Sequence, residues 1–592
     1  MLWIDVTDLV EFIASGSTVS GVQRVEAQLV PLLIEGDSCA VVLDRTRGEF
    51  VELTATEVIE LLHDGVSSGV ATATQSAKAA ISRAATTLPS KLDERPNSVL
   101  LSLGAMWIND QLMAATRAAV SRGVRFVNYF YDLTPVLDAG HATDLRPLFE
   151  RYLALLGDCS DRIPAISQSS RDDLAAYLQN QDLRVPPGVA TALPSGLDPR
   201  EGDTDVLNTN PSTHMEYALM VGTVEARKNH LLAFHAWEEL ISVYGADNVP
   251  NLICVGKIGW NSGEFQERLG ATDGLDGKIT LRSEGITDVE LAELYRNALF
   301  TIYPSNYEGW GLPVTESLLF GTPVVTARNS SLIEAGGELA CYFPTGDLDE
   351  FIRIIETEML DPETRDGHRR RIAEEFQDPV TWLDITVLIK QEVQSAQNQE
   401  RPGQATPTLE NGKSYSLAAP HTAFTDRLIV GNQRPPQPWG FPIFASQEIT
   451  INFVRGTSAE LTVHLGSLCE AGSVVLQINN HDHTFSRGEF VSVNIGAGEG
   501  GTPVQLTLRA VDVGPSEQGF IGLTSITVEG ESAMGTEESE NFMVIKCEAE
   551  NQALRADVEQ LKSELASANL ELDRKSQSLL SRVMRRLNKP SE

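Results

Sequence analysis

The regular alternation of short apolar runs with helix-like segments over residues 1–396 constrains this chain most strongly. Short apolar runs between helices are typical of parallel strands that are buried on both faces of a sheet. One such sheet rarely needs nearly 400 residues, and the polar, turn-rich stretch 198–213 favours a joint. The sequence therefore predicts two Rossmann-like α/β lobes, residues 1–197 and 198–396. The predicted strands are Val99–Leu103, Arg125–Tyr129, Tyr217–Val221, Asn251–Val255, Leu299–Tyr303 and Thr322–Thr326.

Acidic residues dominate the charge of the chain. Its 592 residues include 82 acidic and 46 basic side chains, which give a net charge of −36. This charge argues against broad, nonspecific nucleic-acid binding, because phosphate backbones attract cationic proteins. No stretch approaches the ~18 apolar residues of a membrane span. The opening residues MLWIDVTDLVEF lack the basic start and apolar run of a signal peptide.

The six cysteines are scattered and form no CxxC pair. This distribution excludes a disulfide scaffold and the usual zinc spacings, and it suits a reducing cytosol. We therefore expect an acidic, intracellular, multidomain protein. The cysteines are Cys39, Cys159, Cys254, Cys341, Cys469 and Cys547.

The pattern changes after the second lobe. Residues 397–425 have the composition of a linker, and residues 426–530 alternate apolar and polar positions between Gly-rich turns. This spacing predicts a small antiparallel β-sandwich, which could bind glycan. The predicted strands are Glu460–Leu465, Ser473–Ile478, Phe490–Ile495, Val504–Arg509 and Ile521–Val528.

An acidic linker, residues 531–541, leads to a predicted coiled coil over residues 542–592. Heptad counting places Cys547, Leu554, Leu561 and Ala568 at d positions, and Asn551, Val558, Leu565 and Leu572 at a positions. The coil would join two or three copies of the chain, and Asn551 at an a position favours a parallel dimer. The alternative is a single amphipathic helix docked on the sandwich.

The end of the coil, residues 578–589, is basic and amphipathic. On a strongly acidic protein, such a segment suggests contact with the inner leaflet of a membrane or with an acidic partner. A continuation of the coil with a solvated charged face explains the pattern equally well.

Two segments at strand-to-helix boundaries carry residues suited to chemistry. The first is Tyr303–Ser317, in which a glycine loop precedes a helix that begins near Val314, and Glu308 and Glu316 stand eight residues apart. Such a loop offers free N–H groups, and two carboxylates can accept hydrogen bonds from sugar hydroxyls. The alternative is a capped helix with an acid nearby.

The second segment runs from Val221 to His230, where a strand ends in a turn at Gly222 and a helix follows. Arg227 and Lys228 stand side by side at the start of that helix, and a guanidinium and an ammonium group there suit a diphosphate. Two solvated basic residues are the alternative. The presence of both segments in one α/β half weakens that alternative, because this edge of an open sheet is the ligand side.

At these residues the chain resembles a known family. The stretches VGTVEARKN (221–229) and YEGWGLPVTESLLFGTPVV (307–325) resemble the signature of the retaining glycosyltransferases of family four, which have the GT-B fold. The segment Ser331–Gly337 and the helix that carries Trp382 follow in the order of that family. The resemblance covers residues 1–396.

The resemblance implies roles for residues of the second lobe. Glu316 would bind the ribose of a sugar nucleotide, while Arg227 and Lys228 would hold its diphosphate and stabilise the leaving group. Glu308 would act with the loop backbone on the donor sugar. The further donor-site positions are Gly222, Gly309, Trp310, Gly311, Leu312, Gly285 and Ile286, the last two beside the base.

The resemblance also implies roles in the first lobe. Gly21 matches the glycine loop that faces the phosphates, and Arg24 would line the acceptor cleft. Asp132 matches a catalytic His-Asp element, but Tyr131 stands where the histidine often is. His141 could supply an imidazole instead, although a surface histidine fits that position better.

The resemblance implies no metal and no cofactor beyond the sugar-nucleotide substrate. Asp203-Thr-Asp205 resembles a metal-binding DxD motif, but it lies in the polar joint and is best explained by chance acidity. His481-Asp-His483 is best explained as an exposed turn.

The resemblance implies a metal-independent, retaining hexosyltransferase of polysaccharide or lipopolysaccharide biosynthesis. It would move a hexose or deoxyhexose, with mannose favoured, from a nucleotide-diphosphate sugar to a growing lipid-linked glycan. We expect it in the cytoplasm or peripherally on the inner face of the cytoplasmic membrane. A catalytically silent glycan-binding or scaffold protein is the main alternative. An epimerase or a phosphorylase on the same fold is another, although no lysine has a distinctive pyridoxal-binding context.

Overall fold

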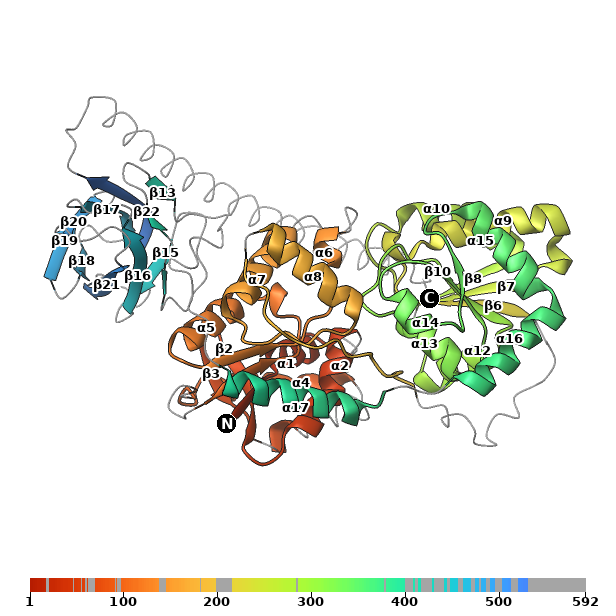
Figure 1. Ribbon diagram of the computed structural model, residues 1–592, viewed down its shortest axis with the longest axis horizontal. Helices are drawn as coiled ribbons and strands as arrows, with labels where there is room; N and C mark the ends of the chain where they lie inside the picture. The colour runs from red at the N-terminus through yellow and green to blue at the C-terminus, as the bar shows by residue number, and fades with distance from the viewer. Residues whose placement is uncertain are drawn as a thin grey trace, which may run out of the picture. The chain divides into compact units, whose positions relative to one another are not determined.

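The chain forms two compact units, Met1–Gln404 and Ala405–Glu592, in its computed structural model (Figure 1). No helix in the described part of the chain has both the length and the apolarity needed to cross a bilayer. Beyond residue 399, the structure describes only the strands between residues 408 and 530. Residues 1–399 are described except for 17–20, 46, 55, 59–60, 62–69, 91, 93–96, 138–144, 182, 198–215, 284–285 and 377–379.

The first lobe is built on a five-stranded sheet of order β3-β2-β1-β4-β5. Its strands are parallel except for the edge strand β3, which runs antiparallel to β2. The strands are β1 (Leu2–Asp5), β2 (Ser38–Asp44), β3 (Glu49–Glu52), β4 (Val99–Ser102) and β5 (Arg125–Asn128). The helices are α1 (Thr7–Ala14), α2 (Val22–Leu33), α4 (Val70–Ala84), η1 (Met106–Ile108), α5 (Asp110–Ser121), α6 (Thr134–Leu137), α7 (Arg146–Cys159) and α8 (Gln168–Asn180).

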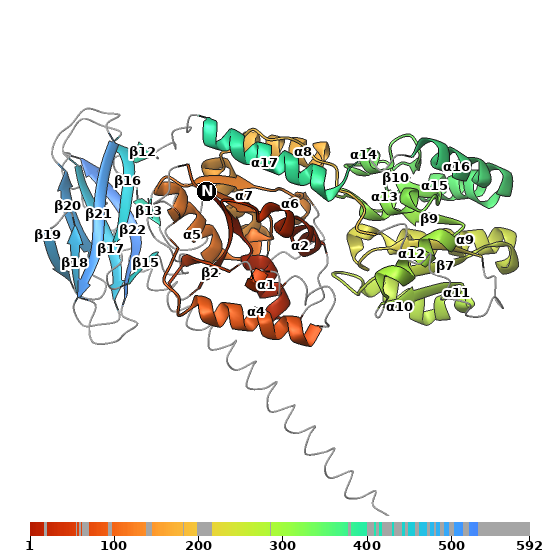
Figure 2. The same ribbon diagram turned by 90° about the horizontal axis from the view of Figure 1, so that it is seen from below.

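Helices cover both faces of this first sheet (Figures 1 and 2). Successive side chains of β1 enter different cores, because strand residues point alternately to opposite faces. Leu2 and Ile4 pack with residues of α1, α2 and α4. Trp3, between them, packs with residues of α5 and α7 on the other face. This double burial explains why the strand is apolar throughout.

The second lobe has a fully parallel six-stranded sheet of order β11-β10-β9-β6-β7-β8. The strands are β6 (Tyr217–Val221), β7 (Asn251–Val255), β8 (Ile279–Arg282), β9 (Phe300–Tyr303), β10 (Val324–Ala327) and β11 (Cys341–Phe343). The helical elements are η2 (Ala226–Lys228), α9 (His230–Tyr244), η3 (Ala246–Asn248), α10 (Gly263–Ala271), α11 (Asp273–Gly277), α12 (Asp288–Asn297), α13 (Leu312–Leu319), α14 (Leu332–Gly336), α15 (Leu348–Ile354), η4 (Ile355–Leu360), α16 (Pro362–Glu375) and α17 (Trp382–Asn398).

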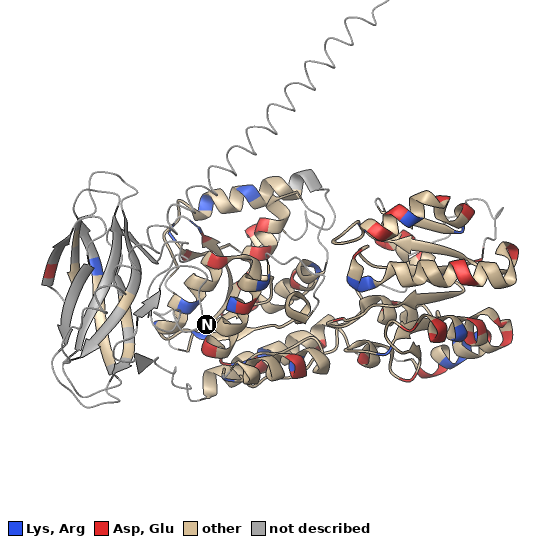
Figure 3. Ribbon diagram, turned by 90° about the horizontal axis from the view of Figure 1, so that it is seen from above, with Lys and Arg blue, Asp and Glu red and all other residues tan. Residues whose placement is uncertain are grey.

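Charge is nearly absent from the second sheet. Arg282, the last residue of β8, is the one charged residue in its six strands, and the acidic and basic residues lie on helices and loops (Figure 3). Charged side chains therefore reach the sheet mainly through the loops at its edges. If β6 to β11 are renumbered 1 to 6 in chain order, the order across the sheet is 3-2-1-4-5-6. In sheets with this doubly wound order, ligands bind at the point where the strand order reverses. That point lies between β6 and β9.

The last helix of the first unit, α17, packs against the first lobe although it follows the second lobe in the chain. Thr381 and Asp384 form a capping box at its N-terminus, and Ile385, Ile389 and Val393 form its buried stripe. Glu392 forms a two-pronged ion pair with Arg162 of the first lobe, with N–O distances of 2.7 and 3.0 Å. The helix therefore ties the two lobes together.

The second unit contains two sheets with mostly antiparallel pairing. Their strand orders are β12-β16-β21-β18-β19, with β14 beside β16, and β13-β22-β17-β20, with β15 beside β22. The strands are β12 (Thr408–Leu409), β13 (Ser414–Ser416), β14 (Ile429–Val430), β15 (Phe441–Phe444), β16 (Glu448–Arg455), β17 (Leu461–Cys469), β18 (Val474–Ile478), β19 (His481–Phe485), β20 (Phe490–Ile495), β21 (Pro503–Asp512) and β22 (Phe520–Gly530).

The two parallel α/β lobes are confirmed, with strand bounds within one or two residues of those predicted. In the second unit all five predicted strands form, whereas their packing as a sandwich stays a prediction. The expected turn at His481–His483 is wrong, because these residues belong to β19 and pair with β18. The coiled coil and its basic end, residues 542–592, lie outside the described residues, as do residues 531–541.

Candidate functional site

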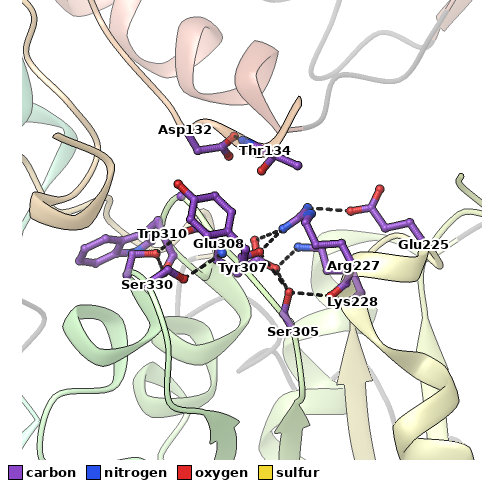
Figure 4. A network of polar contacts seen from close by, with 12 residues as sticks. Asp132, Thr134, Glu225, Arg227, Lys228, Ser305, Tyr307, Glu308, Trp310 and Ser330 are labelled. Atoms are coloured by element: carbon purple, nitrogen blue, oxygen red, sulfur yellow. Dashed lines mark hydrogen bonds and ion pairs between the residues drawn. The ribbon is translucent and has the colours of Figure 1, made fainter. Parts of the chain in front are cut away.

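Two loops leave neighbouring strands at the reversal point of the second sheet. One follows β6 and contains Gly222, Arg227 and Lys228, and the other follows β9 and runs to Gly311. The two loops are joined through their backbones, because the amide of Asn306 donates to the carbonyl of Arg227 at 2.8 Å. The residues that the sequence placed far apart therefore lie in one cluster (Figure 4).

Glu308 lies at the centre of this cluster and is nearly fully buried. Its Oε1 accepts hydrogen bonds from Lys228 Nζ at 2.6 Å, Ser305 Oγ at 2.6 Å and Tyr303 Oη at 2.9 Å. Its Oε2 lies 2.8 Å from Nη1 of Arg227. The two cations thus bind different oxygens of one carboxylate.

These contacts decide the charge of Glu308. Burial alone would raise the pKa of its carboxyl group, but the charges of Arg227 and Lys228, together with hydrogen bonds from Lys228 and Ser305, lower the pKa to about 2. Glu308 is therefore a carboxylate at any physiological pH. Burial lowers the pKa of Lys228, and the charge of Glu308 opposes that effect.

The two cations differ in their further contacts. The guanidinium of Arg227 also donates to the carbonyl of Tyr307 at 2.5 Å and to Oε1 of Glu225 at 2.6 Å. The ammonium of Lys228 donates to Tyr303 Oη at 2.7 Å and lies 5.1 Å from the centre of that ring. Both side chains are mostly buried, so neither is the solvated surface cation that the alternative interpretation required.

The glycine loop is shaped by close contacts at two positions. Gly311 has a φ of 103°, which side chains rarely tolerate, and it precedes the first residue of α13. At Gly309, an added Cβ would lie 2.9 Å from Oδ2 of Asp132 in the first lobe. Asp132 therefore faces the glycine loop directly across the interlobe contact. Its Oδ1 accepts a hydrogen bond from the amide of Thr134 at 2.8 Å.

Glu316 lies in α13 and forms a second buried acidic position. Its Oε2 accepts a hydrogen bond from Tyr295 Oη at 2.8 Å. Burial raises the pKa of Glu316, the hydrogen bond and the charge of Arg24 oppose this effect, and the pKa remains above its ordinary value. Ile286 packs in the same apolar cluster as Tyr295, so Glu316 and Ile286 belong to one neighbourhood.

Arg24 connects the two lobes. Its Nη2 donates to the carbonyl of Gly196 at 2.9 Å and to Oδ2 of Asp288, at the start of α12, at 2.7 Å. The expected acceptor-cleft residue is therefore held in a salt bridge to the second lobe. Gly21 precedes α2 by one residue, has a φ of 56°, and has open space where a Cβ would lie.

The predicted residues thus fall into two groups. Glu308, Arg227 and Lys228 are in contact, and Gly222, Gly309 and Asp132 adjoin them, with Gly222 beside the Lys228 side chain. Glu316, Ile286 and Arg24 form the second group around Tyr295 and Asp288. Trp310 belongs to the loop itself and is buried, and Leu312 is the first residue of α13. Gly285, His141, Asp203 and Asp205 lie outside the described residues.

Sequence reasoning missed several participants. Tyr303 and Ser305 bind Glu308, Glu225 binds Arg227, and Tyr295 binds Glu316. Tyr303 ends an apolar strand and begins the segment of the glycine loop, and a tyrosine at the carboxyl end of a parallel strand is well placed for a ligand-side hydrogen bond. Tyr295 gave no signal, because its contact depends on the packing of α12 against α13.

Residues 208–375 match the family model described as "Glycosyl transferases group 1". The chain is similar to the serotype-specific mannosyltransferase WbdA of Escherichia coli, with 29% identity over 218 residues, 35% of this chain and 26% of the relative. It is similar to O-antigen chain mannosyltransferase B of Escherichia coli, with 33% identity over 251 residues, 41% of this chain and 63% of the relative. The chain thus spans less than two thirds of the length of these curated relatives.

Solved structures also align with the chain. A UDP-forming α,α-trehalose-phosphate synthase from Burkholderia xenovorans aligns with a TM-score of 0.44 and 12% identity, over 67% of this chain and 98% of that one. The family match covers both loops of the cluster, from Gly222 to Gly311, and Glu316 beyond them. Residues 208–375 therefore match the group 1 glycosyltransferase model, and they lie within a unit built of two Rossmann-like α/β lobes.

Proposed function

We propose that this chain is a retaining hexosyltransferase that moves a hexose or deoxyhexose, with mannose favoured, from a nucleotide-diphosphate sugar. The proposed acceptor is a growing, lipid-linked polysaccharide of the O-antigen type. The mannosyltransferase names of the relatives support the donor sugar and the polysaccharide acceptor.

One observation carries this proposal: the buried carboxylate of Glu308 binds both Arg227 and Lys228 at the reversal point of the second sheet. A buried cation pair at that edge suits a diphosphate, since ligands of such sheets bind outside the carboxyl ends of the strands. Both cations are already paired with carboxylates in the absence of a ligand, Arg227 with Glu225 and Glu308, and Lys228 with Glu308. Donor binding would therefore compete with Glu308 for the two cations.

The proposed mechanism follows from this charge balance. The diphosphate binds Arg227 and Lys228. The carboxylate of Glu308 then accepts hydrogen bonds from the hydroxyls of the donor sugar. As the bond between the sugar carbon and the phosphate oxygen breaks, Arg227 and Lys228 stabilise the negative charge on the departing diphosphate. The acceptor hydroxyl bonds to the same carbon on the same face, and its proton passes to the departing phosphate oxygen. Asp132 faces this region from the first lobe.

The transfer itself would need no metal and no cofactor beyond the sugar nucleotide, because the two cations supply the positive charge. We place the protein in the cytoplasm or peripherally on the inner face of the cytoplasmic membrane, where a lipid-linked acceptor is accessible. The second unit would bind glycan, and the coiled coil would join two or three copies.

A donor screen with matched variants tests the proposal. We expect transfer or slow hydrolysis with one nucleotide-diphosphate sugar, and Lys228→Ala should lower kcat/KM by about 10²–10³-fold, the loss typical of one preorganised charge contact. Lys390→Ala is the matched control, since Lys390 forms an exposed ion pair with Glu35 and should leave the rate unchanged. Equal rates for wild type and Lys228→Ala, or no turnover of any donor in the presence of glycolipid fractions, would instead favour the catalytically silent scaffold.

A further inference from the structure

Three side chains with metal-binding atoms lie close together in the second lobe, beside the edge strand β11. Cys341 is the first residue of the edge strand β11, Glu358 lies in the π-helix η4, and His368 lies in α16. Their ligand atoms all lie within 4.8 Å of one another. The Sγ of Cys341 is 3.7 Å from Nε2 of His368, and that nitrogen is 2.9 Å from Oε2 of Glu358.

These separations are close to those of a tetrahedral metal site. Zinc lies about 2.3 Å from sulfur and about 2.0–2.1 Å from nitrogen or oxygen, which places its ligands roughly 3.4–3.6 Å apart. The sulfur–nitrogen separation is slightly longer and the nitrogen–oxygen separation slightly shorter than this range. Shifts of a few tenths of an ångström would bring these two separations into the range, and the third pair of ligand atoms lies within 4.8 Å.

The donor set selects the class of metal. Thiolate, imidazole and carboxylate together suit zinc and similar divalent transition metals, whereas magnesium and calcium prefer oxygen ligands alone. A thiolate and a carboxylate also carry the two negative charges that balance a divalent cation. We propose that Cys341, Glu358 and His368 bind one zinc ion, with a fourth position open to water.

The three ligands come from three different elements, each partly exposed to solvent. The metal would therefore join the edge strand β11 to the two helical elements that precede α17. The π-helix that carries Glu358 adds weight, because single π-helical turns occur frequently at functional sites. Thr357 Oγ1 lies 3.4 Å from the other carboxylate oxygen of Glu358 and would orient it from the outer shell.

This site is distinct from the proposed donor site. Cys341 lies at the amino end of β11, whereas Gly222 and the glycine loop follow the carboxyl ends of β6 and β9. The strands are parallel, so these are opposite edges of the same sheet. The proposed zinc site is therefore separate from the residues of the proposed transfer reaction. It departs from the absence of metal ligands expected from the cysteine spacing.

Metal binding here releases a proton. The metal–sulfur bond forms as the thiol passes its proton to solvent, and His368 binds through the neutral Nε2. In the metal-free protein, the same imidazole nitrogen contacts the carboxylate of Glu358.

Cobalt(II) titration of the full chain, stripped of metal by a chelator, tests the proposal. Tetrahedral cobalt bound to a thiolate shows a sulfur-to-metal charge-transfer band in the near ultraviolet and intense visible bands. We expect these bands to saturate at one cobalt per chain and zinc to displace them. Cys341→Ser should abolish the charge-transfer band and weaken zinc binding by more than about 100-fold, since even outer-shell partners are worth about 10–100-fold.

Two matched controls keep the result specific. Cys39→Ser removes another half-buried thiol, and His235→Ala breaks the exposed pair of His235 with Glu238, so both should keep the full spectrum. Glu358→Gln retains the thiol and should weaken binding by at least about tenfold. The absence of a charge-transfer band in the wild type, or its persistence in a folded Cys341→Ser protein, would overturn the proposal.

Discussion

Two buried glutamates show how the neighbours of a residue set its charge. Glu308 has two cations beside it, and its pKa falls to about 2. Glu26, in α2, is also fully buried, but no hydrogen-bond partner of either carboxylate oxygen exists within the described residues. Burial, and then the charges of Asp8 and Asp5, raise the pKa of Glu26 well above its ordinary value. One glutamate is therefore held ionised and the other neutral in the same unit.

Glu26 should make the stability of the fold depend on pH. Its unfolded-state pKa is near 4.5 and its folded pKa is raised, so the contribution of Glu26 to the free energy of unfolding is most favourable below pH 4.5. It then falls with rising pH, by at most about 1.4 kcal/mol per pH unit, until the pH passes the folded pKa. Glu26→Gln should remove this contribution, and urea unfolding from about pH 5 to about pH 9 measures it.

Asp5 provides the comparison for this prediction. Burial, opposed by hydrogen bonds from Thr7, raises the pKa of Asp5 to about 7. The effect of Asp5→Asn should therefore level off near pH 7, whereas the difference between wild type and Glu26→Gln should level off only at the folded pKa of Glu26. Parallel pH profiles for wild type and Glu26→Gln would show that Glu26 is ionised in the folded state.

At the level of secondary-structure elements, the N-terminus of α8 receives a carboxylate from the other lobe. The Oε2 and Oε1 atoms of Glu334 accept hydrogen bonds from the amides of Gln168 and Ser169, each at 2.8 Å. The first amides of a helix have no partner within it, and its dipole favours a negative charge there. Near this contact, Tyr307 Oη donates to Oδ2 of Asp173, also in α8, at 2.8 Å. Helix α8 thus contacts the second lobe beside the glycine loop.

Glu334→Gln should loosen this contact without unfolding either lobe. Loss of a charged cap at a helix N-terminus typically costs about 0.5–2 kcal/mol. We expect faster hydrogen exchange at the amides of Gln168 and Ser169, with exchange in the sheet unchanged. Asp172→Asn, on the exposed side of the same turn, is the control. Unchanged exchange at both amides in Glu334→Gln would show that the contact does not hold the lobes together.

The ion pair between α17 and the first lobe should contribute more to stability. Glu392 is buried, and Arg162 is mostly buried. Removing the acid alone leaves a buried guanidinium unpaired, so Glu392→Ala should destabilise the unit by about 3 kcal/mol and lower its melting temperature. The double variant Arg162→Met/Glu392→Leu should recover most of this loss. Lys390→Ala, which removes an exposed pair on the same helix, should cost under about 1 kcal/mol.

At the scale of the whole molecule, charged or titratable side chains lie beside both α/β sheets at the point where the strand order reverses. In the second sheet this is the cationic cluster between β6 and β9. In the first sheet the same position, between β1 and β4, holds Asp5 and Asp8, and Oδ2 of Asp8 accepts from the amide of Ala105 at 2.9 Å. The two lobes thus use the same edge, one with paired charges and one with carboxyl groups of raised pKa.

Assembly of the molecule is predicted from sequence alone. If residues 542–592 form a coiled coil, light scattering should give the full chain a mass of two or three copies of 64.5 kDa. Deleting residues 542–592 should reduce this mass to a single copy. A monomeric full-length chain would leave the amphipathic helix docked on the second unit as the better interpretation, and an unchanged oligomer after deletion would place the interface elsewhere.

The sequence by itself determined the local elements and the chemical character of the second lobe. Strands buried on both faces must be apolar along their length, so the positions of β6, β7 and β9 could be predicted from their apolar runs. The glycine loop and the adjacent Arg227 and Lys228 were readable because each lies within a few residues of the end of its strand. These features depend on neighbours in the chain.

Contacts between distant segments were decided only by the tertiary structure. The approach of Lys228 to Glu308 requires β6 to lie beside β9, and Arg24 meets Asp288 only once the two lobes are in contact. Likewise, Cys341, Glu358 and His368 follow no metal-binding spacing and meet only because a π-helix and α16 fold back on β11. Strand order and lobe contact bring such residues together through packing, which leaves no periodic trace in the sequence.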